Sequence, residues 1–178
     1  MAAGLALVPE DRRHQALVLT ASVVENVGLV NPPGAVRRGL LVRRVLRTAA
    51  ARAVEALRIK TRTLDTPVGF LSGGNQQKVV LGRWLARDAH VLLLDEPTRG
   101  VDVGAKAEIH RHLRERAASG LALLVASSEL PELLSLCDRI YVLRQGRIAG
   151  ELPRERASAV EVLRLATGVS AATGQGAA

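Results

Sequence analysis

Aromatic residues are almost absent from this chain of 178 residues, which contains only Phe70, Trp84 and Tyr141. Its core must therefore be built from Leu, Val, Ile and Ala, a composition typical of a parallel sheet buried under helices. The apolar content of 48% is that of a globular protein. A chain of this length buries a single core, so we expect one domain.

Cysteine is represented only by Cys137, which excludes an internal disulfide, and the four histidines do not complete a metal-ligand cluster with it. The segment Met1–Arg13 has no basic n-region, so we expect no cleaved signal peptide and a cytoplasmic protein. No apolar run approaches the about 18–20 residues that cross a bilayer. Attachment to a membrane is therefore expected to depend on a partner.

The basic residues are unevenly distributed along the chain. Residues 34–62 contain nine Arg and Lys and the single acidic residue Glu55, so this segment accounts for the whole net charge of +8. We expect an anionic partner to meet this segment, although a solvated helical face explains the same pattern equally well.

Apolar periodicity indicates an α/β chain. Residues 36–57 have helical spacing, and a second helix is expected after Ser72, a plausible N-cap, with an inward stripe of Val80, Leu81, Trp84 and Leu85. Strands and helices then alternate, which implies a parallel sheet. The expected elements are strands 91–95 and 122–127, helix 105–118, a short helix near 132, a hairpin of 140–143 with 148–152, and a helix over 158–166.

Two adjacent carboxylates, Asp95 and Glu96, follow the apolar run Val91–Leu94. Parallel sheets bind ligands at the carboxyl ends of their strands, and we expect buried carboxylates there. One carboxylate can hold Mg²⁺ through its water while the other orients an attacking water. Alone, however, such a pair more often simply begins a polar loop.

The segment Leu71–Lys78 begins with Ser72, Gly73 and Gly74, which let backbone N–H groups at a helix N-terminus approach an anion closely. In isolation an ordinary capped helix explains it equally well. The order of the motifs decides between these interpretations. This segment, then Leu93–Thr98, then Gly100–Gly104, resembles the signature, Walker B and D-loop of ABC ATPases in that order.

The resemblance covers about Leu5–Ala166 and is closest to the second cassette of double-cassette monosaccharide importers. It implies an α/β fold with a RecA-like P-loop NTPase core, in which helices flank a parallel sheet, and a small α-helical subdomain. The implied parts are core strands and a coupling loop in 1–30, a basic helical subdomain in 31–70, the signature, Walker B and D-loop in 71–167, and a disordered tail in 168–178.

Residue roles follow from the resemblance alone. Ser72, Gly73 and Gly74 would grip the γ-phosphate of ATP on a facing cassette, with Asn75 and Gln76 beside them. Asp95 would lie near Mg²⁺, Glu96 would be the base, and Asp102 would lie between cassettes. The loop Pro9–Arg12 would report nucleotide state to a permease. The implied partners are a second cassette, transmembrane permease subunits and, indirectly, a sugar-binding protein, which would place the chain at the cytoplasmic face of the membrane.

The sequence departs from the family pattern at two places. None of its sixteen glycines is followed by Lys, so the phosphate loop G-x-x-x-x-G-K-[ST] is absent. The chain is therefore expected to start after that loop and to bind ATP poorly by itself. Ser128 stands where most cassettes have a histidine that contacts the γ-phosphate, which weakens the case for hydrolysis at the chain's own site.

Two alternatives remain open at this stage. The Arg-rich segment suits an ABC-like nucleic-acid-associated ATPase, but it lacks aromatic residues for base stacking, so no nucleic-acid partner is expected. A non-functional gene fragment is also compatible with the missing loop, because an uncovered sheet edge favours aggregation.

Overall fold

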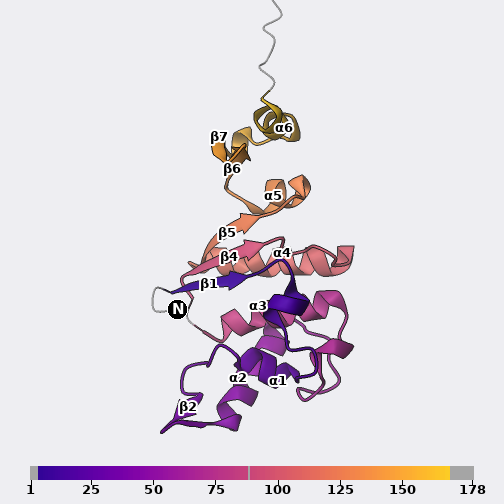
Figure 1. Cartoon of the computed structure of the whole chain (residues 1–178), viewed down its shortest axis with the longest axis vertical. Coiled ribbons are helices and arrows are strands. Elements are labelled where there is room, and N and C mark those ends of the chain that lie inside the picture. Colours follow the sequence, from indigo (N-terminus) through magenta and orange to yellow (C-terminus); the bar gives the residue numbers. More distant parts are fainter. Residues whose placement is uncertain (1–3, 88, 169–178) are drawn as a thin grey trace, which may run out of the picture. The chain divides into compact units, whose positions relative to one another are not determined.

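The computed structural model describes residues 4–87 and 89–168, and the chain divides into two compact units, Met1–Ala126 and Ser127–Ala178 (Figure 1). We describe each unit separately. The boundary between the two units falls inside the expected segment 71–167. The expected parts 1–30, 31–70, 71–167 and 168–178 remain predictions. The tail expected to be disordered lies outside the described residues except for Gly168, which ends the last helix with a φ of 74°.

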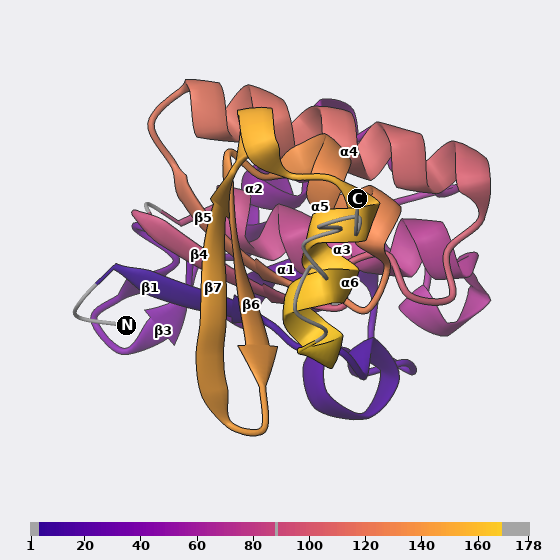
Figure 2. The same cartoon turned by 90° about the horizontal axis from the view of Figure 1, so that it is seen from above.

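The first unit is built on a parallel sheet, which confirms the expected α/β fold. Strands β1 (Leu5–Val8), β4 (Val91–Asp95) and β5 (Ala122–Ala126) run side by side in the order β1-β4-β5 (Figures 1 and 2). Helix α4 (Val103–Ala118) connects β4 to the parallel β5, as such a crossover requires. The carboxyl ends of the three strands therefore lie at one edge.

The sheet of this unit is buried on only one face. Ala6, Val8, Leu92 and Leu94 alternate into the core and are at most 5% exposed. On the opposite face Leu5, Leu7 and Leu124 are about half exposed. Among the residues that the structure describes, the core of this unit therefore lies against one face of the sheet.

Helices α1 (Val23–Gly28), α2 (Arg43–Ala56) and α3 (Gly73–Leu85) pack together in the first unit (Figure 1). Ser22 begins α1 with a capping box, in which its hydroxyl accepts from Glu25 N and Glu25 accepts from Ser22 N at 2.8 Å. Arg83 on α3 is buried and donates to the carbonyl oxygens of Ala16 and Asn26 at 2.5 and 3.1 Å. This burial lowers the pKa of Arg83 to about 10. The buried guanidinium thus ties α3 to the chain before and within α1.

The continuous helical pattern expected for 36–57 is wrong in its first part. Strands β2 (Val36–Arg37) and β3 (Leu40–Leu41) form an antiparallel hairpin, and α2 begins only at Arg43. Arg38 and Gly39 have φ values of 50° and 79°, and two positive φ angles in a two-residue loop suit the right-handed twist of a hairpin. The expected inward stripe of α3 is fully buried at Val80 and Leu81 and half-buried at Trp84 and Leu85.

The second unit contains helix α5 (Leu130–Leu136), the antiparallel hairpin β6 (Arg139–Arg144) and β7 (Arg147–Pro153), and helix α6 (Ala159–Thr167). The expected hairpin and closing helix are confirmed to within one or two residues. Ile140, Val142 and Leu152 form its core, against which Cys137 packs. Burial raises the pKa of the Cys137 thiol, which fits a small apolar side chain rather than a reactive one.

The described residues also form three short helical turns, namely a π-helical turn at Arg12–Ala16 and 3₁₀ turns at Val68–Phe70 and Arg154–Arg156. Within the described ranges, no helix has the length and apolarity that a bilayer crossing requires.

Candidate functional site

The helix α3 begins at an exposed serine whose hydroxyl is already an acceptor. Ser72 is the N-cap, as the sequence predicts, and its Oγ accepts from Asn75 Nδ2 at 2.9 Å and from Asn75 N at 3.5 Å. Asn75 is held in turn by Lys60 N, which donates to its Oδ1 at 2.8 Å. Because both contacts use the oxygen of Ser72 as acceptor, its O–H proton remains to be donated outward.

Gly73 and Gly74 lie very close to neighbouring segments. A Cβ at Gly74 would lie 2.6 Å from the Cβ of Ala105, and a Cβ at Gly73 would lie 2.7 Å from Nη2 of Arg12. The first N–H groups of a helix have no intrahelical partner, so these two residues leave donors at the end of α3. The glycines therefore bring the start of α3 against the start of α4.

The loop after β4 leads into α4 and forms the other side of this junction. Asp102 is the N-cap of α4 and accepts from Ala105 N at 2.9 Å. Arg12 donates to the carbonyl oxygens of Arg99 and Gly100 at 2.9 and 3.3 Å, and Glu10 forms an ion pair with Arg99. The segments Pro9–Arg12, Ser72–Gly74 and Arg99–Asp102 thus form one cluster, which we call the junction.

The carboxylates Asp95 and Glu96 lie where β4 ends and this loop begins. Asp95 is exposed and Glu96 is half-buried, so the expectation of buried carboxylates is wrong. Glu96 has a φ of 46°, and its N–H donates to Ala126 O on β5 at 2.8 Å. A non-glycine residue in this left-handed region is uncommon, and such strain often accompanies functional sites.

Asp95 fits the protein's share of a nucleotide-bound Mg²⁺ site. Magnesium is commonly held by one or two carboxylates, with water and substrate phosphates filling its other positions. An exposed carboxylate at the end of the central strand offers such a ligand. Within 4–87 and 89–168, no group of three His, Cys, Asp or Glu side chains is placed to bind a metal ion by itself.

Gln76, another predicted site residue, points into the protein. It is 1% exposed, and its Nε2 donates to the carbonyl oxygens of Val68 and Leu71 at 3.1 and 3.2 Å. Its side chain therefore fixes the loop that leads to Ser72.

The predicted site residue Ser128 belongs to the second compact unit, where it is exposed at the approach to α5. Nearby, Ser127 Oγ donates to Glu132 at 2.5 Å and accepts from Glu129 N at 3.0 Å. The structure thus joins the Ser72 and Asp102 segments directly and continues the Asp95–Glu96 strand into their junction.

Two contributors to this site were not singled out from the sequence. Arg12 was read only as part of the loop Pro9–Arg12, and its contacts span 87 and 88 residues of chain. Lys78 is buried on α3 and forms an ion pair with Glu108 on α4. In the sequence, Lys78 directly precedes the apolar residues Val79–Leu81, and a lysine buried among such residues is rare unless it is paired. This was the local signal for its ion pair.

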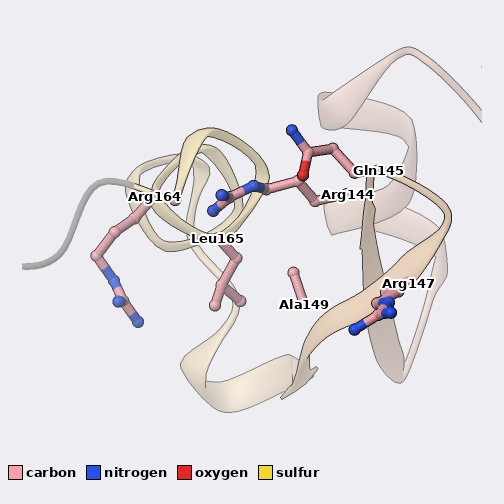
Figure 3. Close-up of a pocket in the computed structure, with 7 residues that line it drawn as sticks. Arg144, Gln145, Arg147, Ala149, Arg164 and Leu165 are labelled. Atoms are coloured by element: carbon pink, nitrogen blue, oxygen red, sulfur yellow. The ribbon is translucent and has the colours of Figure 1, made fainter.

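A separate pocket of about 700 Å³ lies in the second unit, between the β6–β7 hairpin and α6 (Figure 3). Arg144 and Arg147 from the hairpin and Arg164 from α6 line it around the apolar pair Ala149 and Leu165. Arg164 is already paired with Glu161 at 2.9 Å. None of the residues predicted for the site lines this pocket.

Comparison with known proteins shows the family of the chain. Residues 3–99 match the family model described as ABC transporter. The chain is 54% identical over 166 residues to the "Ribose import ATP-binding protein RbsA 1" of Streptomyces avermitilis, covering 93% of this chain and 32% of that protein. It is 48% identical to the "Putative ribose/galactose/methyl galactoside import ATP-binding protein 1" of Rhizobium etli, covering 94% and 32%. The chain thus spans about a third of the length of the curated relatives it matches.

Solved structures show the same fold. The structure of cbiO1 from Clostridium perfringens, described as part of the ABC transporter complex cbiONQ, matches with a TM-score of 0.71 and 25% identity over 91% of this chain and 62% of that one. The dimeric ATP-binding cassette MJ0796, bound to ADP and Pi, matches with a TM-score of 0.69 and 23% identity over 84% and 62%. The expected fold class is therefore confirmed.

Proposed function

Because this chain belongs to the ABC transporter family, we propose that it acts as part of the ATP-binding component of a carbohydrate importer. The names of its sequence relatives, which refer to ribose and galactose import, support a monosaccharide as the transported class. Within that component, its main task is to present Ser72, Gly73 and Gly74 to ATP held by a facing cassette.

The observation that carries this proposal is the outward-facing N-terminus of α3. Ser72 is exposed, its oxygen is used by Asn75, and its proton is available to a phosphate oxygen. The adjacent glycines add backbone N–H donors, and the helix dipole favours an anion at the same place. A γ-phosphate approaching from outside the chain would therefore meet a hydroxyl donor and backbone N–H donors at the helix end.

Asn75 and Gln76 support this arrangement in different ways. Asn75 holds the Ser72 hydroxyl in place, so its contribution to phosphate binding is to orient that proton. Gln76 is buried and fastens the preceding loop through Val68 and Leu71. We therefore assign Gln76 to positioning and not to direct contact with nucleotide.

The carboxylates would act at the chain's own nucleotide site and not on the ATP that Ser72 contacts on the facing cassette. Asp95 would contribute to Mg²⁺, which supplies charge neutralisation of the β- and γ-phosphates when it is bound. Glu96 would accept a proton from the attacking water, and Ser128 would contact the γ-phosphate from the second unit. Asp102, which caps α4 at the junction, would lie at the interface with the second cassette.

The proposed partners follow from the same role. The second cassette would hold the ATP that Ser72 contacts, and permease subunits would carry the sugar across the membrane. A sugar-binding protein would be an indirect partner. The loop Pro9–Arg12 would report nucleotide state to the permease, and its fastening to Arg99 and Gly100 supports this path. The chain would then work at the cytoplasmic face of the membrane.

The test measures ATP turnover by an intact cassette of the same importer class, mixed with this chain or its variants. We expect the unchanged chain to raise turnover and Ser72→Arg to abolish that increase, because the larger cation replaces the donor and blocks the helix end. Glu96→Gln should have little effect, since the carboxylate belongs to the chain's own site.

Ser158→Arg provides the matched control. Ser158 is also an N-cap serine, accepting from Glu161 N at 3.2 Å at the start of α6, so this variant loses an equivalent cap elsewhere. It should stimulate turnover as the unchanged chain does. Turnover that depends on Glu96 but not on Ser72 would contradict the proposal.

A further inference from the structure

We propose that the β2–β3 hairpin and the first turns of α2 bind the surface of an anionic lipid bilayer directly. This surface, which we call the basic hairpin, comprises residues 36–47. The inference goes beyond the proposed ATPase role and does not depend on it, because lipid contact requires neither nucleotide nor a second cassette.

The tip of the basic hairpin exposes aliphatic side chains that the unit does not cover. Val36, Leu40 and Leu41 are 49%, 74% and 61% exposed. Leu40 and Leu41 are neighbours on one strand, so they point to opposite faces of the hairpin and both faces are apolar. Figure 1 shows β2 projecting from the rest of the first unit. The apolar tip is therefore accessible to a flat surface.

The base of the hairpin is anchored, so the tip is presented in one conformation. Val42 N donates to Ala35 O at 2.8 Å, and Ala35 N donates to Pro32 O at 2.9 Å. Ala35 is fully buried. The positive φ angles of Arg38 and Gly39 set the turn between the strands.

Exposed arginines surround this apolar tip. Arg37 and Arg38 lie in the hairpin, and Arg43, Arg44 and Arg47 follow in the first turns of α2. Arg47 is paired with Asp65 at 2.6 Å, while the other four have no ion pair among the residues that the structure describes. The segment 34–62, which contains them, carries a net charge equal to that of the whole chain. Arginine stems lie along apolar surface while their guanidinium groups reach anions, which suits the lipid headgroup region.

The combination favours lipid over nucleic acid. Binding to the phosphate backbone of a nucleic acid requires cations but no exposed leucines. Binding to single strands also uses aromatic side chains, and residues 34–62 contain none. Exposed leucines at the tip are explained by insertion at the boundary between headgroups and acyl chains. Stable membrane binding usually requires two signals, and here an apolar tip is joined to a basic patch.

The experiment is flotation of the full chain with vesicles of phosphatidylcholine containing phosphatidylglycerol, compared with vesicles of phosphatidylcholine alone. We expect binding to the anionic vesicles that falls as salt is raised, because exposed charges are screened. Leu40→Ser with Leu41→Ser should weaken it several-fold. Neutralising Arg37, Arg38, Arg43 and Arg44 to Gln should weaken it by roughly fivefold for each arginine that contacts the surface.

The controls make changes of the same two kinds on the second unit. Val160 and Leu163 are 73% and 57% exposed, so Val160→Ser with Leu163→Ser removes comparable apolar surface, and Arg154→Gln with Arg156→Gln removes exposed charge. Both controls should float as the unchanged chain does. Thermal unfolding midpoints show whether each variant is folded. The leucine variant tests the apolar contribution of the basic hairpin, and the arginine variant tests its charge.

Three results would overturn the proposal. The first is absence of flotation with anionic vesicles, and the second is flotation equally reduced by the control variants. The third is binding to a DNA duplex that depends on the four arginines while flotation does not. Since ATP turnover is not measured, none of these results bears on the proposed function.

Discussion

The guanidinium of Arg12 donates a hydrogen bond of 2.9 Å to the backbone carbonyl of Arg99, 87 residues further along the chain. A second donor of the same group reaches Gly100 O at 3.3 Å, and Gly73 approaches its Nη2 so closely that a Cβ there would lie at 2.7 Å. One side chain therefore fastens the loop Pro9–Arg12 to the Arg99–Asp102 segment and lies beside Gly73.

Replacing Arg12 should loosen this junction. We expect Arg12→Ala to lower the free energy of unfolding by about 1–3 kcal/mol, because two backbone acceptors lose a charged donor. Arg12→Lys should recover only part of the loss, since an ammonium lacks the planar fork that reaches both carbonyls. Urea unfolding measures the difference, and the exposed neighbour Arg13→Ala should change little. Equal effects at the two positions would contradict the assigned role.

The buried Lys78 should make stability depend on Glu108. Their ion pair joins α3 to α4, and the hydrogen bond from Lys78 lowers the pKa of Glu108. We expect Glu108→Gln to cost about 1–3 kcal/mol because a buried ammonium is left without its counter-charge. Asp65→Asn, which breaks the exposed pair with Arg47, should cost less than about 1 kcal/mol.

The same pair predicts a pH dependence. Because the pKa of Glu108 is lower in the folded state, its contribution to stability is present above its unfolded pKa and is lost as pH falls through its folded pKa. Urea midpoints measured on the acid side should therefore fall less in Glu108→Gln than in the unchanged chain. An identical slope in both proteins would remove the pair as a cause.

We expect position 74 to require glycine because there is no room for a side chain there. A Cβ there would meet Ala105 at 2.6 Å, so Gly74→Ala should cost about 1–3 kcal/mol by forcing the starts of α3 and α4 apart. At Gly104, a Cβ would make only an ordinary 3.5 Å contact with Asp102, and Gly104→Ala should stabilise α4 by about 0.5–1 kcal/mol. Calorimetric unfolding of both variants tests the pair, and destabilisation by both would contradict it.

The left-handed backbone at Glu96 leads to a comparison of two neutral replacements. Glu96→Asn and Glu96→Gln both remove the carboxylate, but Asn tolerates a φ of 46° far better. We expect the Asn variant to be more stable than the Gln variant by several tenths of a kcal/mol. Thermal unfolding of the two variants side by side measures this, and a more stable Gln variant would show that the backbone angle carries no strain.

Local signals explain how much of this site the sequence predicts. The cap at Ser72 and the strand end at Asp95 were predicted from residues within a few positions of each, and both are confirmed. The helix expected from residue 105 begins at Val103 instead, with Asp102 as its cap. The contacts of Arg12 join positions 87 and 88 residues apart, and no local pattern encodes that distance. Gln76 can be buried because its side chain donates to two backbone carbonyl oxygens, and the spacing of residues in the sequence does not indicate these contacts.

The basic hairpin shows where periodicity is misleading. Leu41 falls on one helical stripe with Val45 and Ala49, but Arg38 and Gly39 before it adopt positive φ angles and turn the chain back on itself. An Arg-Gly pair is a weaker hairpin signal than Asn-Gly, because arginine rarely enters the left-handed region. The one-sided burial of the sheet likewise depends on what covers each face, which alternation along a strand does not specify.

The hydrogen bonds that the Ser72 hydroxyl accepts from Asn75 limit what this hydroxyl can recognise. Since Asn75 occupies its acceptor capacity, Ser72 works in one direction only, as a giver of a proton. A ligand group that only offers hydrogens, such as an ammonium, gains no hydrogen bond from this hydroxyl. The Ser72 hydroxyl thus selects by polarity, because it favours a ligand oxygen that accepts a hydrogen bond before size or shape is considered.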